Sequence, residues 1–186
     1  MVRSVETRIP KSLILVAWPM PDGKEAERAL ALQVLTSVVK DRLRESLREE
    51  LGAAYSPAIQ GKFSRTYPGR GILFAQAFAE PDLAQEVLDA TLRVVAKLSQ
   101  QGAKEEEVLR ALEPMKKRFR DAQRTNGFWA QALGEAFRNP QSLVDLRLAE
   151  DRLHAVQASS LTPYLSFLQK NSAATLLVHP QVEEQE

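Results

Sequence analysis

The chain has 186 residues, 44% of them hydrophobic, and its 25 lysines and arginines nearly balance its 24 aspartates and glutamates. This length and apolar content suit one globular domain, and the net charge of +1 gives no global reason to expect nucleic acid or an anionic membrane as partner. Without any cysteine the chain can form no disulfide, thiolate zinc site or cysteine nucleophile. We predict a single domain over residues 1–180 and an acidic tail over residues 181–186.

The N-terminal region offers an apolar run only at residues 13–18. This run is too short to span a membrane, and no small-residue cleavage site of a signal peptide accompanies it. The sequence therefore predicts a soluble protein without a membrane span. Because Met1 leads almost directly into the run, the chain is equally consistent with a segment of a longer protein.

The first predicted elements are a strand and a long helix. Residues 12–18 (SLILVAW) form a continuous apolar run, which is typical of a strand buried on both faces, and turn residues follow it between Pro19 and Gly23. From residue 24 to residue 51, leucines and valines recur at spacings of three and four. This spacing predicts a helix with one buried stripe, which ends at Gly52.

Two further strands are predicted next. Residues 53–65 would place Tyr55, Ile59 and Phe63 on one face, and residues 71–79 (GILFAQAFA) resume an extended pattern after a turn. These two runs suggest an antiparallel pair.

Helices dominate the rest of the chain. They are predicted over residues 80–102, over 105–126 with a kink at Pro114, over 128–138, over 142–154, and from Thr162 onward. Residues 173–179 (AATLLVH) return to a strand composition. The order β-α-β-β, helices, β predicts an α+β fold, with a sheet of about four or more strands and helices covering one face.

Few residues offer metal or nucleophile chemistry. The two histidines, His154 and His179, lie 25 positions apart, and neither belongs to an HxxH, HExxH or HxxEH motif. We therefore expect no metal and no cofactor bound by this chain. No GxSxG or phosphate-binding glycine loop is present, which argues against a serine nucleophile and a nucleotide cofactor.

The basic run KKRFR at residues 116–120 is the best nucleic-acid candidate. However, Phe119 continues the apolar stripe of Val108, Leu112 and Met115, so the cations lie on the other faces of the helix. We interpret them as ordinary solvated charges and expect no nucleic-acid partner.

The segment LREELGAAYSP carries the most functional information, because it sets Arg48 seven residues before Tyr55 across a helix end. A guanidinium and a phenol together can donate to an oxyanion or a carbonyl without any proton transfer. The alternative is structural: Arg48 can bond the last helical carbonyls, and Tyr55 can be a half-buried strand residue. From the residues alone the structural alternative is favoured, although a helix reversing at Gly52 brings both side chains to one edge of the sheet.

At these residues the sequence resembles the insulinase or pitrilysin-like zinc peptidases, which include the mitochondrial processing peptidase. The resemblance is to their zinc-free C-terminal domain, and it extends through GILFAQAFAEPDLAQEVLDATLRVVAKL and TNGFWAQAL. One departure is that VLTSVVKDRLRESLREE stands where many members have a glycine-rich stretch, which is nearer to the bacterial zinc proteases. The resemblance thus implies a location in the bacterial cytoplasm or periplasm.

The resemblance implies a clamshell of two similar halves, of which only the N-terminal half carries HxxEH and zinc. This chain would be the substrate-gripping, non-zinc-binding C-terminal domain of a metalloendopeptidase, inactive alone, with Arg48 and Tyr55 supporting the substrate or the transition state. Its implied partners are a zinc-bearing half or partner subunit and a peptide substrate. The alternative is a non-catalytic structural or chaperone-like module derived from the same family.

Overall fold

The computed structural model describes residues 1–51 and 57–181, apart from the side chains of residues 50, 51 and 170. The strands are β1 (Val2–Glu6), β2 (Ser12–Met20), β3 (Ala58–Phe63), β4 (Gly71–Ala79) and β5 (Ala174–Gln181). The helices are α1 (Ala26–Leu51), α2 (Ala84–Gln101), α3 (Glu105–Ala122), α4 (Asn126–Arg138), α5 (Gln141–Arg147), α6 (Ala149–Ala155) and α7 (Thr162–Leu165). Short 3-10 turns occupy Ala158–Leu161, Ser166–Leu168 and Lys170–Ser172.

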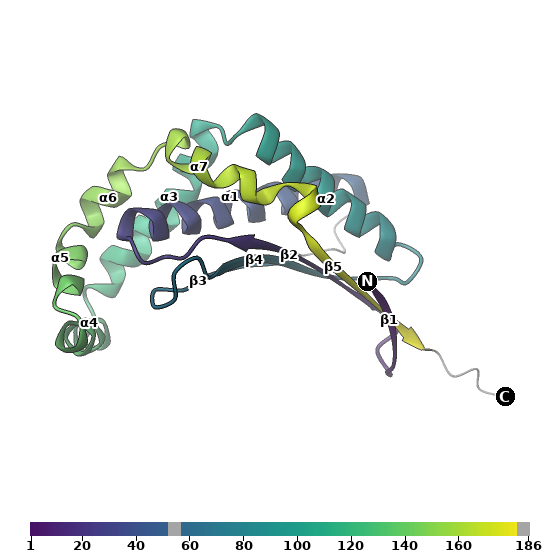
Figure 1. Ribbon diagram of the computed structural model, residues 1–186, viewed down its shortest axis with the longest axis horizontal. Coiled ribbons are helices and arrows are strands. Elements are labelled where there is room, and N and C mark those ends of the chain that lie inside the picture. Colours follow the sequence, from purple (N-terminus) through teal and green to yellow (C-terminus); the bar gives the residue numbers. More distant parts are fainter. Residues whose placement is uncertain (52–56, 182–186) are drawn as a thin grey trace.

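In the described part of the chain the strands form one five-stranded sheet in the order β1-β5-β2-β4-β3. Strand β1 pairs with β5 in parallel, and the other pairs are antiparallel. The helices lie over one face of the sheet and leave the other face uncovered, so that the molecule has the shape of an arch (Figure 1). The predicted α+β class, with helices on one face, is therefore confirmed.

Alternation along the central strands separates a covered from an uncovered face. Along β2, Ile14, Val16 and Trp18 are each at most 1% exposed, whereas the residues between them are half-buried. The buried residues pack beneath α1 and α2 into the hydrophobic core. The prediction that residues 12–18 are buried on both faces is therefore wrong, because the helices cover only one of the two faces.

The structure also differs from the sequence-based boundaries at three places. Strand β1 was not predicted, because all its residues are exposed and its pairing partner, β5, lies at the far end of the chain. The helix predicted over residues 142–154 is divided into α5 and α6 at Leu148. The strand predicted over residues 53–65 is described as β3, and residues 53–56 of that prediction lie outside the described residues.

The buried carboxylate of Asp22 links the turn before α1 to the turn between β3 and β4. Asp22 accepts hydrogen bonds from the backbone N–H groups of Gly69 at 2.6 Å and Lys24 at 3.1 Å, and from Arg28 Nη1 at 2.9 Å. The Gly69 bond, the Lys24 bond and the Arg28 charge hold the pKa of Asp22 below its ordinary value. Gly69 has φ of +65°, the left-handed conformation that suits glycine. This cluster fixes the β3–β4 turn against the first turn of α1.

Candidate functional site

Arg48 lies in the last turn of α1, where the exposed side chain follows directly after the fully buried Leu47. Leu43 and Leu47 hold this half of the helix in the core. Within the described part of the chain, no hydrogen bond or ion pair engages the Arg48 guanidinium. A permanently charged, solvent-facing group with unused donors is available to bind a carbonyl or a carboxylate from outside the domain.

Tyr55, the second predicted site residue, lies outside the described residues, so its distance from Arg48 is not defined. The flanking elements are described. Helix α1 ends at Leu51 and β3 begins at Ala58, after the buried Pro57. Strand β3 is an edge strand of the sheet, and it packs against α1.

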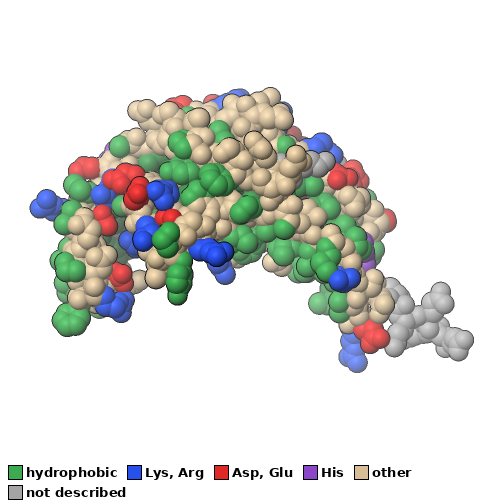
Figure 2. Space-filling model, viewed as in Figure 1, with side chains coloured by type: hydrophobic (Ala, Val, Ile, Leu, Met, Phe, Trp, Pro, Cys, Tyr) green, Lys and Arg blue, Asp and Glu red, His purple; other side chains and the backbone are tan. Residues whose placement is uncertain are grey.

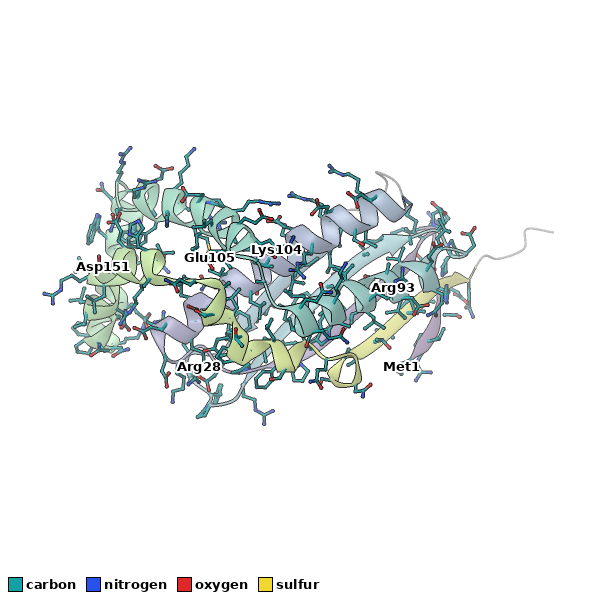
Figure 3. All side chains as sticks on the ribbon, turned by 90° about the horizontal axis from the view of Figure 1, so that it is seen from above. Met1, Arg28, Arg93, Lys104, Glu105 and Asp151 are labelled. Atoms are coloured by element: carbon teal, nitrogen blue, oxygen red, sulfur yellow. The ribbon has the colours of Figure 1, made fainter. Side chains whose placement is uncertain are left out.

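An ion pair fixes the C-terminal half of α1. Arg42 donates from Nε to Glu107 Oε1 at 2.6 Å and from Nη2 to Glu107 Oε2 at 2.7 Å, and Nη2 also donates to the Gly102 carbonyl at 2.9 Å. Both side chains are 17% exposed. Glu107 also accepts from the backbone N–H of Lys104 at 2.7 Å, and Lys104 marks this turn beside α1 in Figure 3. Arg42 thus ties α1 to the α2–α3 turn.

The hydrogen bonds from Arg42, followed by the one from the Lys104 N–H, hold the pKa of Glu107 below its ordinary value. A groove of about 550 Å³ opens beside this pair between α1 and α2, lined by charged residues of both helices such as Glu45, Glu49 and Lys97. Arg48 is not among the lining residues. The mixed charges of the groove give it no single preference for anions or cations.

A second cavity, of about 460 Å³, lies beside the N-terminal half of α1. Its apolar wall includes Phe63 and Phe119, and Arg152 lies at its polar side. Arg152 donates to Glu27 at 2.6 Å and to Asp145 at 3.1 Å, so its charge is already paired. The charge of Arg152 is therefore already used within the domain. Sequence patterns did not reveal the cavity, because its walls come from distant elements.

The donor set does not fit a zinc ion. His154 is exposed on α6, whereas the Nδ1 atom of His179 on β5 lies 2.8 Å from Ser12 Oγ. The two elements lie at opposite ends of the arch (Figure 1). Among the residues that the structure describes, no three His, Cys, Asp or Glu side chains gather where they could hold a metal.

In the basic run on α3, the aromatic residue faces the core and most of the cations face the solvent, as the helical spacing predicts. Phe119 is half-buried against the core, and its ring meets that of Phe128 edge-on at 6.1 Å between centroids. Lys117, Arg118 and Arg120 are exposed. The predicted position of Phe119 in the apolar stripe is confirmed.

No helix in residues 1–51 and 57–181 is both long and apolar enough to cross a membrane.

Solved structures with similar folds include a protease and inactive peptidase domains. The inactive peptidase domain of a candidate zinc protease from Bordetella parapertussis has 15% identity and a TM-score of 0.77, covering 98% of this chain and 97% of that one. The periplasmic protease PqqL from Escherichia coli has 18% identity and a TM-score of 0.76. This match covers 96% of this chain but only 20% of the PqqL chain. A peptidase M16 inactive domain from Pseudomonas fluorescens has 14% identity and a TM-score of 0.71. This match covers 100% of this chain and 45% of the Pseudomonas fluorescens chain.

This chain thus spans a fifth of PqqL and under half of the Pseudomonas fluorescens chain. No curated protein matches the sequence. The family model of the peptidase M16 inactive domain matches residues 1–115, which is more than half of the chain. The match confirms the resemblance to the zinc-free domain of these zinc peptidases and agrees with the absence of HxxEH from the sequence. The chain belongs to the family of peptidase M16 inactive domains.

Proposed function

We propose that this chain is the substrate-gripping C-terminal domain of a zinc metalloendopeptidase that hydrolyses peptides or proteins. The observation that carries the proposal is Arg48, an exposed cation in the last turn of α1 on a domain of the inactive peptidase family. Arg42, six residues earlier on α1, is by contrast paired with Glu107 within the domain.

In this proposal Arg48 and Tyr55 have different roles, which follow from their chemistry. The Arg48 guanidinium offers a planar set of donors to peptide carbonyls or a carboxylate. The Tyr55 hydroxyl is a neutral donor that can stabilise charge developing on the scissile carbonyl oxygen. A zinc ion in the other half would polarise that carbonyl and activate water. The chain itself holds the substrate and supplies no base.

The proposal requires a partner with the zinc motif, either an N-terminal half or a partner subunit. The reaction is tested by combining the purified chain with a separately purified HxxEH-containing half and following hydrolysis of fluorescently labelled casein. We expect no hydrolysis by the chain alone and zinc-dependent hydrolysis by the combination.

Arg48→Gln should lower kcat/KM of the combination by about tenfold or more, since hydrogen bonds to charged groups contribute roughly 1.5–3 kcal/mol. Arg44→Gln is the matched control, because Arg44 lies one turn earlier on α1 and makes only an exposed pair with Asp41 at 3.1 Å. The control should leave kcat/KM unchanged. Equal effects of both variants would contradict the role of Arg48. A combination that does not hydrolyse casein would instead favour a non-catalytic structural or chaperone-like module.

A further inference from the structure

An open cavity lies beside the β3–β4 turn, at the face of the sheet that the helices leave uncovered. Its volume of about 600 Å³ falls within the range of roughly 300–1,000 Å³ that is typical of ligand sites. Its apolar part includes Pro19 of β2 and Ile72 of β4, and its polar part includes Lys62 of β3 and Arg70 of the turn. Arg48 does not line this cavity.

The strand register places three of the lining residues in one row. Ile72 pairs with Pro19 on one side and with Lys62 on the other. All three are exposed, and paired residues of neighbouring strands point to the same face of a sheet. The Lys62 ammonium also lies 5.8 Å from the centre of the Phe74 ring, which attracts it toward this face. The row therefore sets an ammonium beside two apolar side chains.

The turn that carries Arg70 is held by hydrogen bonds. The Ser64 N–H donates to the Arg70 carbonyl at 2.8 Å, and Ser64 Oγ accepts from the Tyr67 N–H at 2.8 Å. The Gly69 N–H donates to the Asp22 carboxylate at 2.6 Å. A ligand therefore meets a preformed backbone, and little conformational entropy is lost when it binds.

Neither cation of the cavity is paired with a carboxylate in the described part of the chain. No aspartate or glutamate occurs in residues 51–79, which include Lys62 and Arg70. The Asp22 carboxylate at the same turn is buried and does not line the cavity, and it already pairs with Arg28. Two cations beside one cavity without a neighbouring carboxylate give it a positive potential, which favours an anionic ligand.

The apolar part of the cavity argues for a peptide and against a small inorganic anion. Figure 2 shows hydrophobic side chains along the hollowed underside of the arch, with Lys and Arg side chains beside them. An inorganic anion has no apolar part to cover Pro19 and Ile72. A carboxylate side chain that is flanked by apolar residues complements both the cations and the apolar surface.

We propose that this cavity binds an acidic residue of an extended substrate segment, with the carboxylate between Lys62 and Arg70 and a neighbouring apolar residue on Pro19 and Ile72. The turn beside the cavity is fixed against the first turn of α1, whereas Arg48 lies in the last turn. The two sites thus contact different parts of a peptide. This inference deepens the proposed function and rests on it for the identity of the peptide as a substrate.

Peptide binding by the chain alone tests the preference without any hydrolysis. The probes are two serine-rich peptides that differ only at their centre, which is leucine–glutamate–leucine in one and leucine–glutamine–leucine in the other. In a nitrogen-15 NMR titration the glutamate peptide should shift the amide resonances of residues 62–72. Its Kd should be roughly five- to tenfold lower than that of the glutamine peptide, since each exposed ion pair contributes modestly. Added salt should narrow this difference.

The double variant Lys62→Gln with Arg70→Gln should bind the two peptides equally. The matched control is Arg8→Gln with Lys11→Gln, which removes the same charge from the exposed connection at the other end of β2. The control should keep the preference for glutamate.

Equal Kd values for the two peptides with the wild-type chain would overturn the proposal, and so would equal losses in the variant and the control. Acetate that shifts the same amides at the same concentration as the glutamate peptide would show binding of a bare anion and would also overturn it. If the zinc-bearing half abolishes the peptide shifts, that half covers the cavity and the proposal fails.

The casein assay of the combination is a separate measurement. Hydrolysis that depends on Arg48, without any preference for the glutamate peptide, would refute this inference and leave the proposed function standing. A preference for the glutamate peptide without hydrolysis by the combination would support the carboxylate site and contradict the proposed function.

Discussion

The two faces of the sheet have similar apolar residues but different environments. On β4, Leu73 is 0% exposed beneath the helices, whereas its neighbour Ile72 on the uncovered face is 39% exposed. Helices α1 and α2 account for the difference, because they cover only the face to which Leu73 belongs. Apolar composition alone therefore does not distinguish the face that the helices cover from the face that they leave uncovered.

The largest expected effect is on the covered face. Leu73→Ala should lower the free energy of unfolding by about 2–5 kcal/mol, because it removes buried contacts and leaves a cavity. Ile72→Ala should lower it by less than about 1 kcal/mol in a monomeric sample, since Ile72 is partly solvated already. Urea unfolding at low protein concentration measures both. Equal losses would mean that the uncovered face of the sheet is as well packed as the core.

Glu107 tests whether polar groups on the covered side support the core. Glu107→Gln should lower the free energy of unfolding by about 1.5–3 kcal/mol at neutral pH, because it removes the charged acceptor of the Arg42 hydrogen bonds. The matched control is Glu106→Gln, an exposed neighbour on α3. Unfolding in urea should show little change for the control.

The same pair predicts a pH dependence. The pKa of Glu107 is lowered in the folded chain, so its contribution is complete above the ordinary value of 4.5 and is lost as the pH falls below 4.5 through the lowered value. Wild-type stability should therefore fall more steeply in this range than that of Glu107→Gln. Parallel pH profiles of the two proteins would contradict the assignment.

The smallest effect is expected on α4. A Cβ added at Gly134 meets no atom within 4 Å, and glycine within a helix costs roughly 0.5–1 kcal/mol relative to alanine. Gly134→Ala should therefore stabilise α4 by up to this amount. Hydrogen exchange of α4 amides measures the change, and faster exchange would show that Gly134 has a conformational role.

The sequence allowed prediction of elements whose signals are local. The spacing of leucines and valines located α1 to within two residues, and residues 71–79 were assigned as the strand that the structure describes. Long-range pairing left no such signal. Strand β1 depends on β5, and the Arg42–Glu107 pair joins residues 65 positions apart.

The sequence also allowed prediction of part of the candidate site. Arg48 was selected from the motif around it, and its exposed position at the end of α1 follows from the periodicity that buries Leu43 and Leu47. The uncovered face of the sheet was not predicted, because a continuous apolar run indicates burial without indicating what covers each side of a strand. Tyr55 lies outside the described residues, so its role stays a prediction.

In the proposed function this domain contributes to catalysis from outside the zinc centre. The kcat of the Tyr55→Phe variant in combination with the zinc-bearing half tests this contribution, because the substitution removes a single hydroxyl. We expect kcat to fall by about 10²–10³-fold, equivalent to about 2.7–4 kcal/mol of barrier. An unchanged kcat would contradict it.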